Sequence, residues 1–101
     1  MFKTTVEFKS GNELEIIEYE TGHYSYKYWR DYKGTLCFRR RWEWHRNLKE
    51  GPHIHDHRPS GAVEKKFTGK KTLRHVLSEI KKEFESDINV KFYVRMVRDR
   101  R

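Results

Sequence analysis

The sequence predicts an α+β fold in which an antiparallel meander sheet of four to six strands carries one amphipathic helix on one face. Two observations support this class. Apolar and polar residues alternate in short segments that are separated by turn residues, as expected for antiparallel strands. In the C-terminal half, apolar residues instead recur at spacings of three and four, as expected for a helix that covers a sheet. A chain of 101 residues is predicted to be a single domain, residues 1–101.

The first 45 residues are predicted to form a four-stranded meander. Strands are expected over residues 2–9, 13–20, 24–32 and 35–45, and tight turns at Ser10-Gly11-Asn12, Thr21-Gly22 and Asp31-Tyr32-Lys33-Gly34. Because turns this short join antiparallel neighbours, consecutive strands should pair with each other. Ile17 and Tyr19 break the alternation of the second strand, which indicates a bulge there.

The second half of the chain is predicted to add a helix and further strands. Residues 51–61 have proline and glycine near both ends, which is typical of a constrained loop or a short edge strand. Residues 62–67 form a short strand. Thr72 is the expected N-cap of a helix that ends near Ser86, with an apolar stripe formed by Leu73, Val76, Leu77, Ile80 and Phe84. Residues 87–97 alternate again and predict a last strand, with an extension of the helix as the alternative.

The composition is basic and contains one cysteine. The net charge of +8 favours a partner that carries phosphate groups, or an acidic protein. Cys37 cannot form an internal disulfide, and no apolar run has the length of a signal peptide or a membrane span, so we expect a cytoplasmic protein without membrane association. The 38% of charged residues is typical of thermophile proteins. Because only 35% of residues are apolar, a partner chain, including a second copy in a homodimer, could complete a thin core.

Residues 35–61 contain four of the six histidines and five arginines. Because strand side chains alternate, one face of residues 35–45 should carry Leu36, Phe38, Trp42 and Trp44, and the other face Cys37, Arg39, Arg41, Glu43 and His45. Three more histidines are spaced two residues apart, so an extended backbone projects all of them to one side: His53, His55 and His57. We therefore expect imidazole and guanidinium groups to converge on one face of the sheet.

This combination of side chains suits RNA cleavage without a metal ion or any other cofactor. Such cleavage needs a base for the ribose 2′-hydroxyl, an acid for the departing 5′-oxygen and cations for the phosphate. Histidine serves as acid and base near neutral pH, and arginine binds phosphate through two parallel hydrogen bonds. We interpret His53 and His55 as acid and base, Arg41 as the phosphate clamp, and His45 and His57 as further candidates. Nucleic-acid contacts are expected from Arg39, Arg40, Arg46 and Arg58.

The same residues allow other interpretations. Imidazoles two residues apart can share a metal ion, which makes His53, His55 and His57 candidate ligands, with Asp56 or His45 completing the shell in a metal-binding protein or metal-dependent nuclease. The basic face can also bind nucleic acid or an acidic partner without catalysis. Finally, a proline-bounded segment that is rich in histidine can be a plain polar surface turn.

The order of these features resembles that of the TumE-type proteins, the toxin components of bacterial and archaeal toxin–antitoxin pairs. The resemblance spans residues 13–80 and rests on Phe38, Arg41 and Trp42, then Gly51-Pro52-His53-Ile54-His55, then Thr72-Leu73 and Val76-Leu77. It implies a toxin that a cognate antitoxin protein neutralises. Combined with the histidines and arginines, it leads us to expect a small metal-independent ribonuclease toxin that acts on RNA.

Overall fold

The computed structural model describes residues 1–85 and, as backbone only, residues 94–98. The elements of these residues are seven strands and one helix, in the order β1 (Phe2–Phe8), β2 (Glu13–Glu18), β3 (Tyr24–Tyr32), β4 (Thr35–Trp44), β5 (His53–His57), β6 (Val63–Phe67), α1 (Leu73–Glu83) and β7 (Val94–Arg98). The end of the strand predicted over residues 87–97 thus forms β7, whereas residues 87–93 of that prediction lie outside the described residues.

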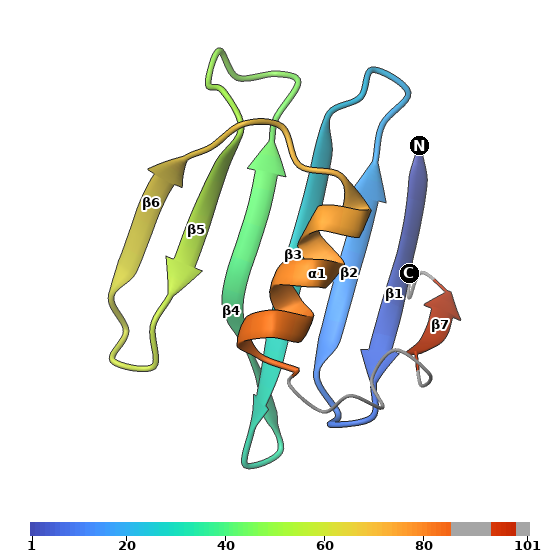
Figure 1. The fold of residues 1–101 in the computed structure, drawn as a ribbon, viewed down its shortest axis with the longest axis vertical. Coiled ribbons are helices and arrows are strands. Elements are labelled where there is room, and N and C mark those ends of the chain that lie inside the picture. Colours follow the sequence, from blue (N-terminus) through green and yellow to red (C-terminus); the bar gives the residue numbers. More distant parts are fainter. Residues whose placement is uncertain (86–93, 99–101) are drawn as a thin grey trace.

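The strands form one antiparallel sheet in the order β6-β5-β4-β3-β2-β1-β7. Strands β1 to β6 make a meander, in which each strand pairs with the next. The chain then crosses one face of the sheet as α1, and β7 pairs with β1 at the opposite edge (Figure 1). The predicted α+β class is confirmed. Strand β5, however, is an internal strand between β4 and β6 rather than a loop or an edge strand.

Three hairpin turns share one backbone pattern, in which a glycine precedes the returning strand. In the first, the Phe8 N–H donates to the Asn12 carbonyl at 2.8 Å and the Gly11 N–H donates to the Phe8 carbonyl at 2.9 Å. The equivalent glycines Gly11, Gly22 and Gly61 have φ values of 92°, 93° and 95°, which glycine adopts without a Cβ clash. The turns predicted at Ser10-Gly11-Asn12 and Thr21-Gly22 are confirmed.

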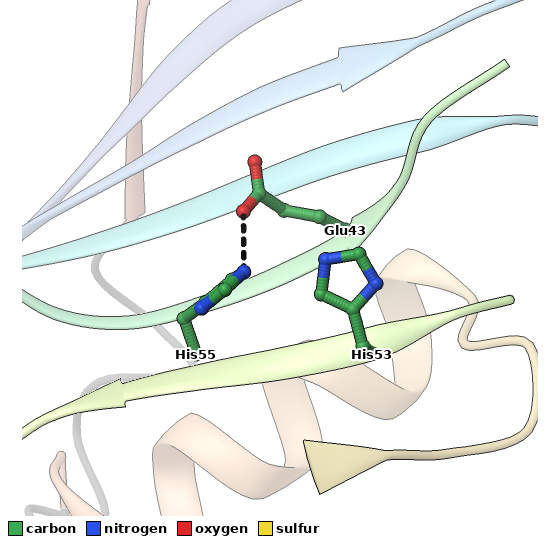
Figure 2. A group of neighbouring side chains, drawn as sticks. All are labelled: Glu43, His53 and His55. Carbon is green, nitrogen blue, oxygen red and sulfur yellow. Dashed lines mark ion pairs between the residues drawn. The ribbon is translucent and has the colours of Figure 1, made fainter. Parts of the chain in front are cut away.

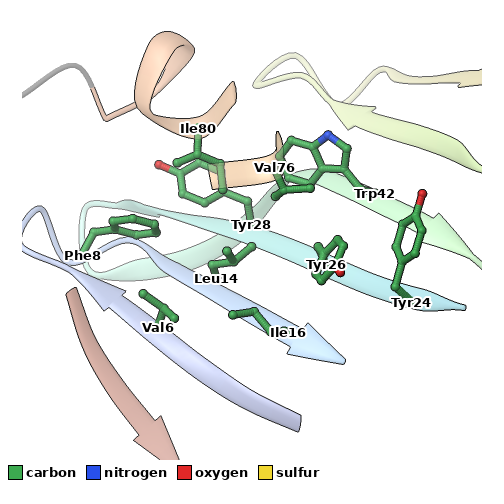
Figure 3. Close-up of a cluster of buried hydrophobic side chains, with 10 residues drawn as sticks. All are labelled: Val6, Phe8, Leu14, Ile16, Tyr24, Tyr26, Tyr28, Trp42, Val76 and Ile80. Carbon is green, nitrogen blue, oxygen red and sulfur yellow. The ribbon is translucent and has the colours of Figure 1, made fainter. Parts of the chain in front are cut away.

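The core lies between α1 and the sheet face that it covers (Figure 3). Thr72 is the N-cap, as predicted, and its hydroxyl accepts a hydrogen bond from the His75 N–H at 3.2 Å. The helix ends at Glu83 rather than near Ser86. Its apolar stripe packs onto strand residues of the same face, and the fully buried members of this core include Leu14, Ile16, Tyr26, Tyr28, Trp42, Val76 and Ile80.

A β-bulge in β4 decides which residues share a face. Tyr28 pairs with Arg40, but Trp29 pairs with Phe38, so Arg39 is the additional residue. The bulge moves Phe38 to the face opposite α1 and leaves Arg39 on the face that α1 covers. Leu36 and Cys37 change face with them, because the whole segment before the bulge is shifted. The predicted alternation of residues 35–45 is therefore wrong from Leu36 to Arg39. In β2, where a bulge was expected, the register is continuous from Glu13 to Glu18.

Candidate functional site

Glu43 lies at the centre of a cluster on the sheet face opposite α1, which we call the open face. The Glu43 side chain, at 4% exposure, is almost fully buried. Its Oε1 atom lies 3.3 Å from Arg41 Nη1 and 3.8 Å from His55 Nε2, and its Oε2 atom lies 3.5 Å from His45 Nε2. Glu43 of β4 is also the register partner of His53 in β5. Figure 2 shows the carboxylate and the two β5 imidazoles extending toward one another from these neighbouring strands.

His53 is the buried member of this group, with 1% of its surface exposed. Its Nδ1 atom lies 2.9 Å from the carbonyl oxygen of Gly51. A carbonyl can only accept, so Nδ1 carries the hydrogen and Nε2 keeps a free lone pair in the neutral ring. The ring packs edge-on against Phe67 at 5.9 Å between centres and against His55 at 4.9 Å. His53 is therefore placed to orient other groups or to coordinate an ion, rather than to meet a large substrate directly.

Arg41 is held on both sides of its guanidinium group. Its Nε–H donates to His57 Nε2 at 3.0 Å, while Nη1 faces Glu43. The guanidinium carbon lies 5.3 Å from the ring centre of Phe38, and that ring stacks on Trp29 at 3.8 Å. Phe38 reaches this position because of the bulge. The open face thus presents a fixed cation beside a pair of aromatic rings.

Burial lowers the pKa of both His55 and His57, because the charged imidazolium loses hydration. The positive charge of Arg41 lowers both pKa values further, and the negative charge of Glu43 opposes the shift. A pKa below its ordinary value keeps these two rings mainly neutral at pH 7. The neutral form is the one that accepts a proton or coordinates a metal ion.

The structure thus brings together Arg41, His45, His53, His55 and His57, but it does not place Arg39 with them. Arg39 lies on the α1 face, where its Nη1 is 2.5 Å from Asp56 Oδ1 and its guanidinium carbon is 4.9 Å from the Phe84 ring centre. The expectation that Arg39 shares a face with Arg41 is wrong, because Arg39 is the additional residue of the bulge and does not follow the alternation of β4.

The other predicted nucleic-acid contacts are spread over the molecule. Arg40 also lies on the α1 face and bridges Asp56 and Glu83, with its Nη1 at 2.7 Å from Glu83 Oε2. Arg46 follows β4 and lies over the Tyr19 ring at 5.0 Å. Arg58, at the turn between β5 and β6, pairs with Glu64 at 3.2 Å. None of these three guanidinium groups contacts Glu43 in the described part of the chain.

Among the described residues, Glu43, His53 and His55 each offer a ligand atom within 4.8 Å of the others. The ligand set predicted from the sequence contained His57 in place of Glu43, with Asp56 or His45 as a further ligand. His57 Nε2 is not available to a metal ion, because it accepts a hydrogen bond from Arg41. Asp56 lies on the α1 face, where it pairs with Arg39 and Arg40. Strand alternation predicts the correct face for Glu43 but not its place at the centre of the cluster. Alternation does not tell which polar residue of a face is buried.

A hollow of about 310 Å³ borders this cluster at the far end of β5. Phe38 and His57 contribute to its wall, so it is continuous with the aromatic pair beside Arg41. The remaining lining residues are Tyr32, Cys37, Arg58, Pro59 and Gly61. The open face therefore offers, side by side, a carboxylate with imidazoles, a guanidinium group, stacked rings and a shallow cavity.

Fold and site together define a small basic α+β protein with one helix-covered sheet face and a histidine and arginine cluster on the other. Residues 1–84 match the family model described as Toxin TumE, and the chain belongs to this family. Membership identifies it as a toxin component and implies an antitoxin partner. No match was found among curated proteins or among solved structures. In the described residues, no helix is both long and apolar enough to span a membrane.

Proposed function

We propose that this toxin is a ribonuclease that cleaves RNA without a metal ion, with the Glu43 cluster as its active site. The observation that supports the proposal most is the convergence of Arg41, His45 and His55 on one carboxylate, on the sheet face that α1 does not cover. These groups supply a phosphate-binding cation and two proton-transfer groups. The net charge of +8 favours association with a polyanion.

In the proposed reaction, neutral His55 takes the proton of a ribose 2′-hydroxyl, and the 2′-oxygen attacks the adjacent phosphorus. His45 donates a proton to the 5′-oxygen as the bond between phosphorus and this oxygen breaks. The products are a 2′,3′-cyclic phosphate and a 5′-hydroxyl. We assign the acid role to His45 because its side chain is 39% exposed, whereas His53 is buried. His53 then acts as a positioning residue that supports the rings of His45 and His55.

Arg41 is the proposed phosphate clamp, and the neighbouring rings are the proposed contact for bases. His57 accepts from Nε of Arg41 and so directs the outer part of the guanidinium group. The stacked pair Trp29 and Phe38 lies next to it, and aromatic rings of this kind bind unpaired bases. The proposed substrate is accordingly single-stranded RNA, held by its phosphate at Arg41 with a base beside Phe38.

The test is cleavage of labelled single-stranded RNA by the full chain in the presence of EDTA. The wild type should release fragments that end in a 2′,3′-cyclic phosphate, and RNA methylated at the 2′-oxygen should resist. The variants His55→Ala and His45→Ala should each cleave at least about 100-fold more slowly, the effect expected for loss of a proton-transfer group. Arg41→Gln should also be slow. His75→Gln and Arg74→Gln, both exposed positions of α1, are the matched controls, with folding checked by circular dichroism.

Two outcomes would contradict the proposal. If RNA is retained by the protein but stays intact, the open face is a binding surface without catalysis. If cleavage disappears in EDTA and returns with a divalent cation, the metal-free reaction is wrong.

A further inference from the structure

We propose that Glu43, His53 and His55 form a binding site for one divalent transition-metal ion, of which Zn²⁺ is the best match. The site shares His55 with the proposed catalytic cluster, but metal binding does not require that the protein cleaves RNA. The argument rests on the burial, the orientation and the spacing of these three side chains.

The orientation of His53 is already that of a metal ligand. Imidazoles that bind metals usually donate their second ring hydrogen to a carbonyl or a carboxylate, which fixes the ring and directs the free lone pair. His53 has this arrangement, because Nδ1 donates to the Gly51 carbonyl and Nε2 is left to coordinate. The ring is also buried, so it loses little further freedom when an ion binds.

The spacing of the three ligand atoms fits one ion after a small contraction. Zinc binds imidazole nitrogen and carboxylate oxygen at about 2.0–2.2 Å, so ligand atoms of a tetrahedral site lie about 3.4 Å apart. His55 Nε2 and Glu43 Oε1 are 3.8 Å apart, and all three ligand atoms lie within 4.8 Å. The fourth position is open to water or to His45, whose Nε2 is 3.5 Å from the other oxygen of Glu43.

The chemistry of the ligands selects the class of ion. Two imidazoles and one carboxylate suit Zn²⁺ and its transition-metal neighbours, whereas Mg²⁺ and Ca²⁺ prefer oxygen ligands alone. A positive ion at this point also compensates a carboxylate that is almost fully buried. Ser25, the register partner of Glu43, adds a buried hydroxyl that has no hydrogen-bond partner among the described residues. A metal-bound water is a suitable partner for such a hydroxyl.

Arg41 is the group that opposes the ion. Its Nη1 is 3.3 Å from Glu43 Oε1, so the guanidinium group competes for the same oxygen and repels a second positive charge. This competition predicts moderate affinity in the wild type and tighter binding once the charge of Arg41 is removed. The second prediction is specific to the proposed ligand set, because Arg41 contacts Glu43 but is not itself a ligand.

The experiment measures Zn²⁺ binding to the EDTA-stripped, dialysed full chain by isothermal titration calorimetry, with Co²⁺ absorption to report the ligands. One ion per chain is expected, and Mg²⁺ should not compete. At 100 times its dissociation constant, Zn²⁺ should raise the midpoint of thermal unfolding by about 10 °C, since it binds only the folded state. A wild type that binds no Zn²⁺ at 100 μM, or binds it without change in the midpoint, would overturn the proposal.

The variants separate this site from the alternatives on the same strand. Glu43→Gln and His55→Ala should weaken Zn²⁺ binding at least about 10-fold, and Arg41→Gln should strengthen it. His57→Ala removes an open-face histidine of β5 that is outside the ligand set, so this variant should still bind Zn²⁺. His75→Gln, at an exposed position of α1, is the matched control. Binding that survives both Glu43→Gln and His55→Ala, or that is lost in His57→Ala, would overturn the assignment. Circular dichroism of each variant identifies any that fails to fold, and Co²⁺ spectra of the wild type then decide whether histidine is a ligand.

Cleavage assays distinguish failure of this proposal from failure of the proposed function. An ion on His55 occupies the lone pair that would take the substrate proton, so Zn²⁺ should inhibit cleavage and EDTA should restore it. If Zn²⁺ instead activates a protein that EDTA has silenced, the metal site stands and metal-free catalysis is wrong. If cleavage needs His55 but no Zn²⁺ binds, catalysis stands and the metal site is wrong.

Discussion

Arg39 and Arg41 are two positions apart in β4, yet they serve opposite faces of the sheet. Arg39 joins Arg40 in holding Asp56 on the α1 face. Burial alone would raise the pKa of Asp56, but hydrogen bonds and charge from these two arginines outweigh it and lower the pKa. Arg41 instead lies beside Glu43 and His57 on the open face. The bulge thus gives Arg39 a structural role on the α1 face, whereas Arg41 has a proposed functional role on the open face.

This separation predicts different effects of two similar substitutions. Arg39→Ala should lower the free energy of unfolding by about 1–2 kcal/mol, because it removes a hydrogen bond between charged groups that are mostly buried. Arg74→Ala, at an exposed position of α1, should change it by less than about 0.5 kcal/mol. Urea unfolding followed by circular dichroism measures both. If Arg39→Ala left the stability unchanged but weakened RNA retention, the assignment of Arg39 to a structural role on the α1 face would be wrong.

Residue types indicated much of the candidate site but not its centre. The spacing of His53, His55 and His57 was sufficient to predict that they share a face, because the period of a strand is two. The role of Glu43 was not predictable in the same way. It depends on burial between two neighbouring strands, and burial depends on pairing between residues that are distant in the sequence. The burial of His53 was not predictable from local sequence either. Its 1% exposure excludes it from direct contact with a large substrate.

At the scale of elements, the repeated hairpin turn depends on a glycine with positive φ. Gly61, between β5 and β6, has a φ of 95°, and a Cβ placed there would meet nothing within 4 Å. A side chain at this position would therefore destabilise the protein through backbone strain and not through a steric clash. Gly61→Ala should lower the free energy of unfolding by about 1 kcal/mol. The left-handed conformation costs alanine about 1–2 kcal/mol, and part of this cost is offset because alanine lowers the conformational entropy of the unfolded chain.

Gly69 provides the matched control for this prediction. It also has open space around a built Cβ, but its φ is not in the left-handed range. Gly69→Ala should therefore be neutral or stabilise the protein by up to about 1 kcal/mol. Equal losses of stability in the two variants, measured by urea unfolding, would mean that backbone strain is not the cause. Gly61→Asn should recover part of the loss, because asparagine tolerates positive φ.

The elements themselves were largely predictable from local patterns. Alternation located β1 to β4, glycine located their turns, and the spacing of Leu73, Val76 and Ile80 located α1 and its buried face. The bulge at Arg39 was not predictable, because a single additional residue leaves the composition of the strand unchanged and is fixed only by pairing with β3. The internal position of β5 was missed for a similar reason, since its flanking prolines are also typical of an edge strand.

At the scale of the whole molecule, a buried carboxylate links the end of α1 to the strands. Glu85 accepts hydrogen bonds from the Ser10 hydroxyl at 2.6 Å, from the Asn12 side-chain amide and from the Tyr28 hydroxyl. These residues come from the first turn, from β3 and from the segment that follows α1. The cluster therefore holds the helix against the sheet at the end opposite its N-cap, and its hydrogen bonds need a protonated Tyr28.

This link predicts a loss of stability at alkaline pH. Burial, followed by the hydrogen bond to Glu85 and its negative charge, raises the pKa of Tyr28 well above its ordinary value of 10. Above about pH 10 the unfolded chain therefore loses this proton while the folded protein keeps it. The free energy of unfolding should then fall by about 1.4 kcal/mol per pH unit because of this tyrosine. Below about pH 10, the stabilisation that Tyr28 provides is fully present.

Tyr26 should contribute in the same way, because burial and a hydrogen bond to Glu18 also raise its pKa. The measurement is urea unfolding between pH 9 and 11.5, with phenolate absorbance at 295 nm recorded in parallel. Tyr28→Phe should be less stable at pH 7, because it loses the bond to Glu85, but its stability should fall less steeply with alkaline pH. If the free energy of unfolding falls equally steeply with pH in the wild type and in Tyr28→Phe, then Tyr28 ionises at the same pH in the folded and the unfolded protein. The buried contact between Tyr28 and Glu85 would then be absent in solution.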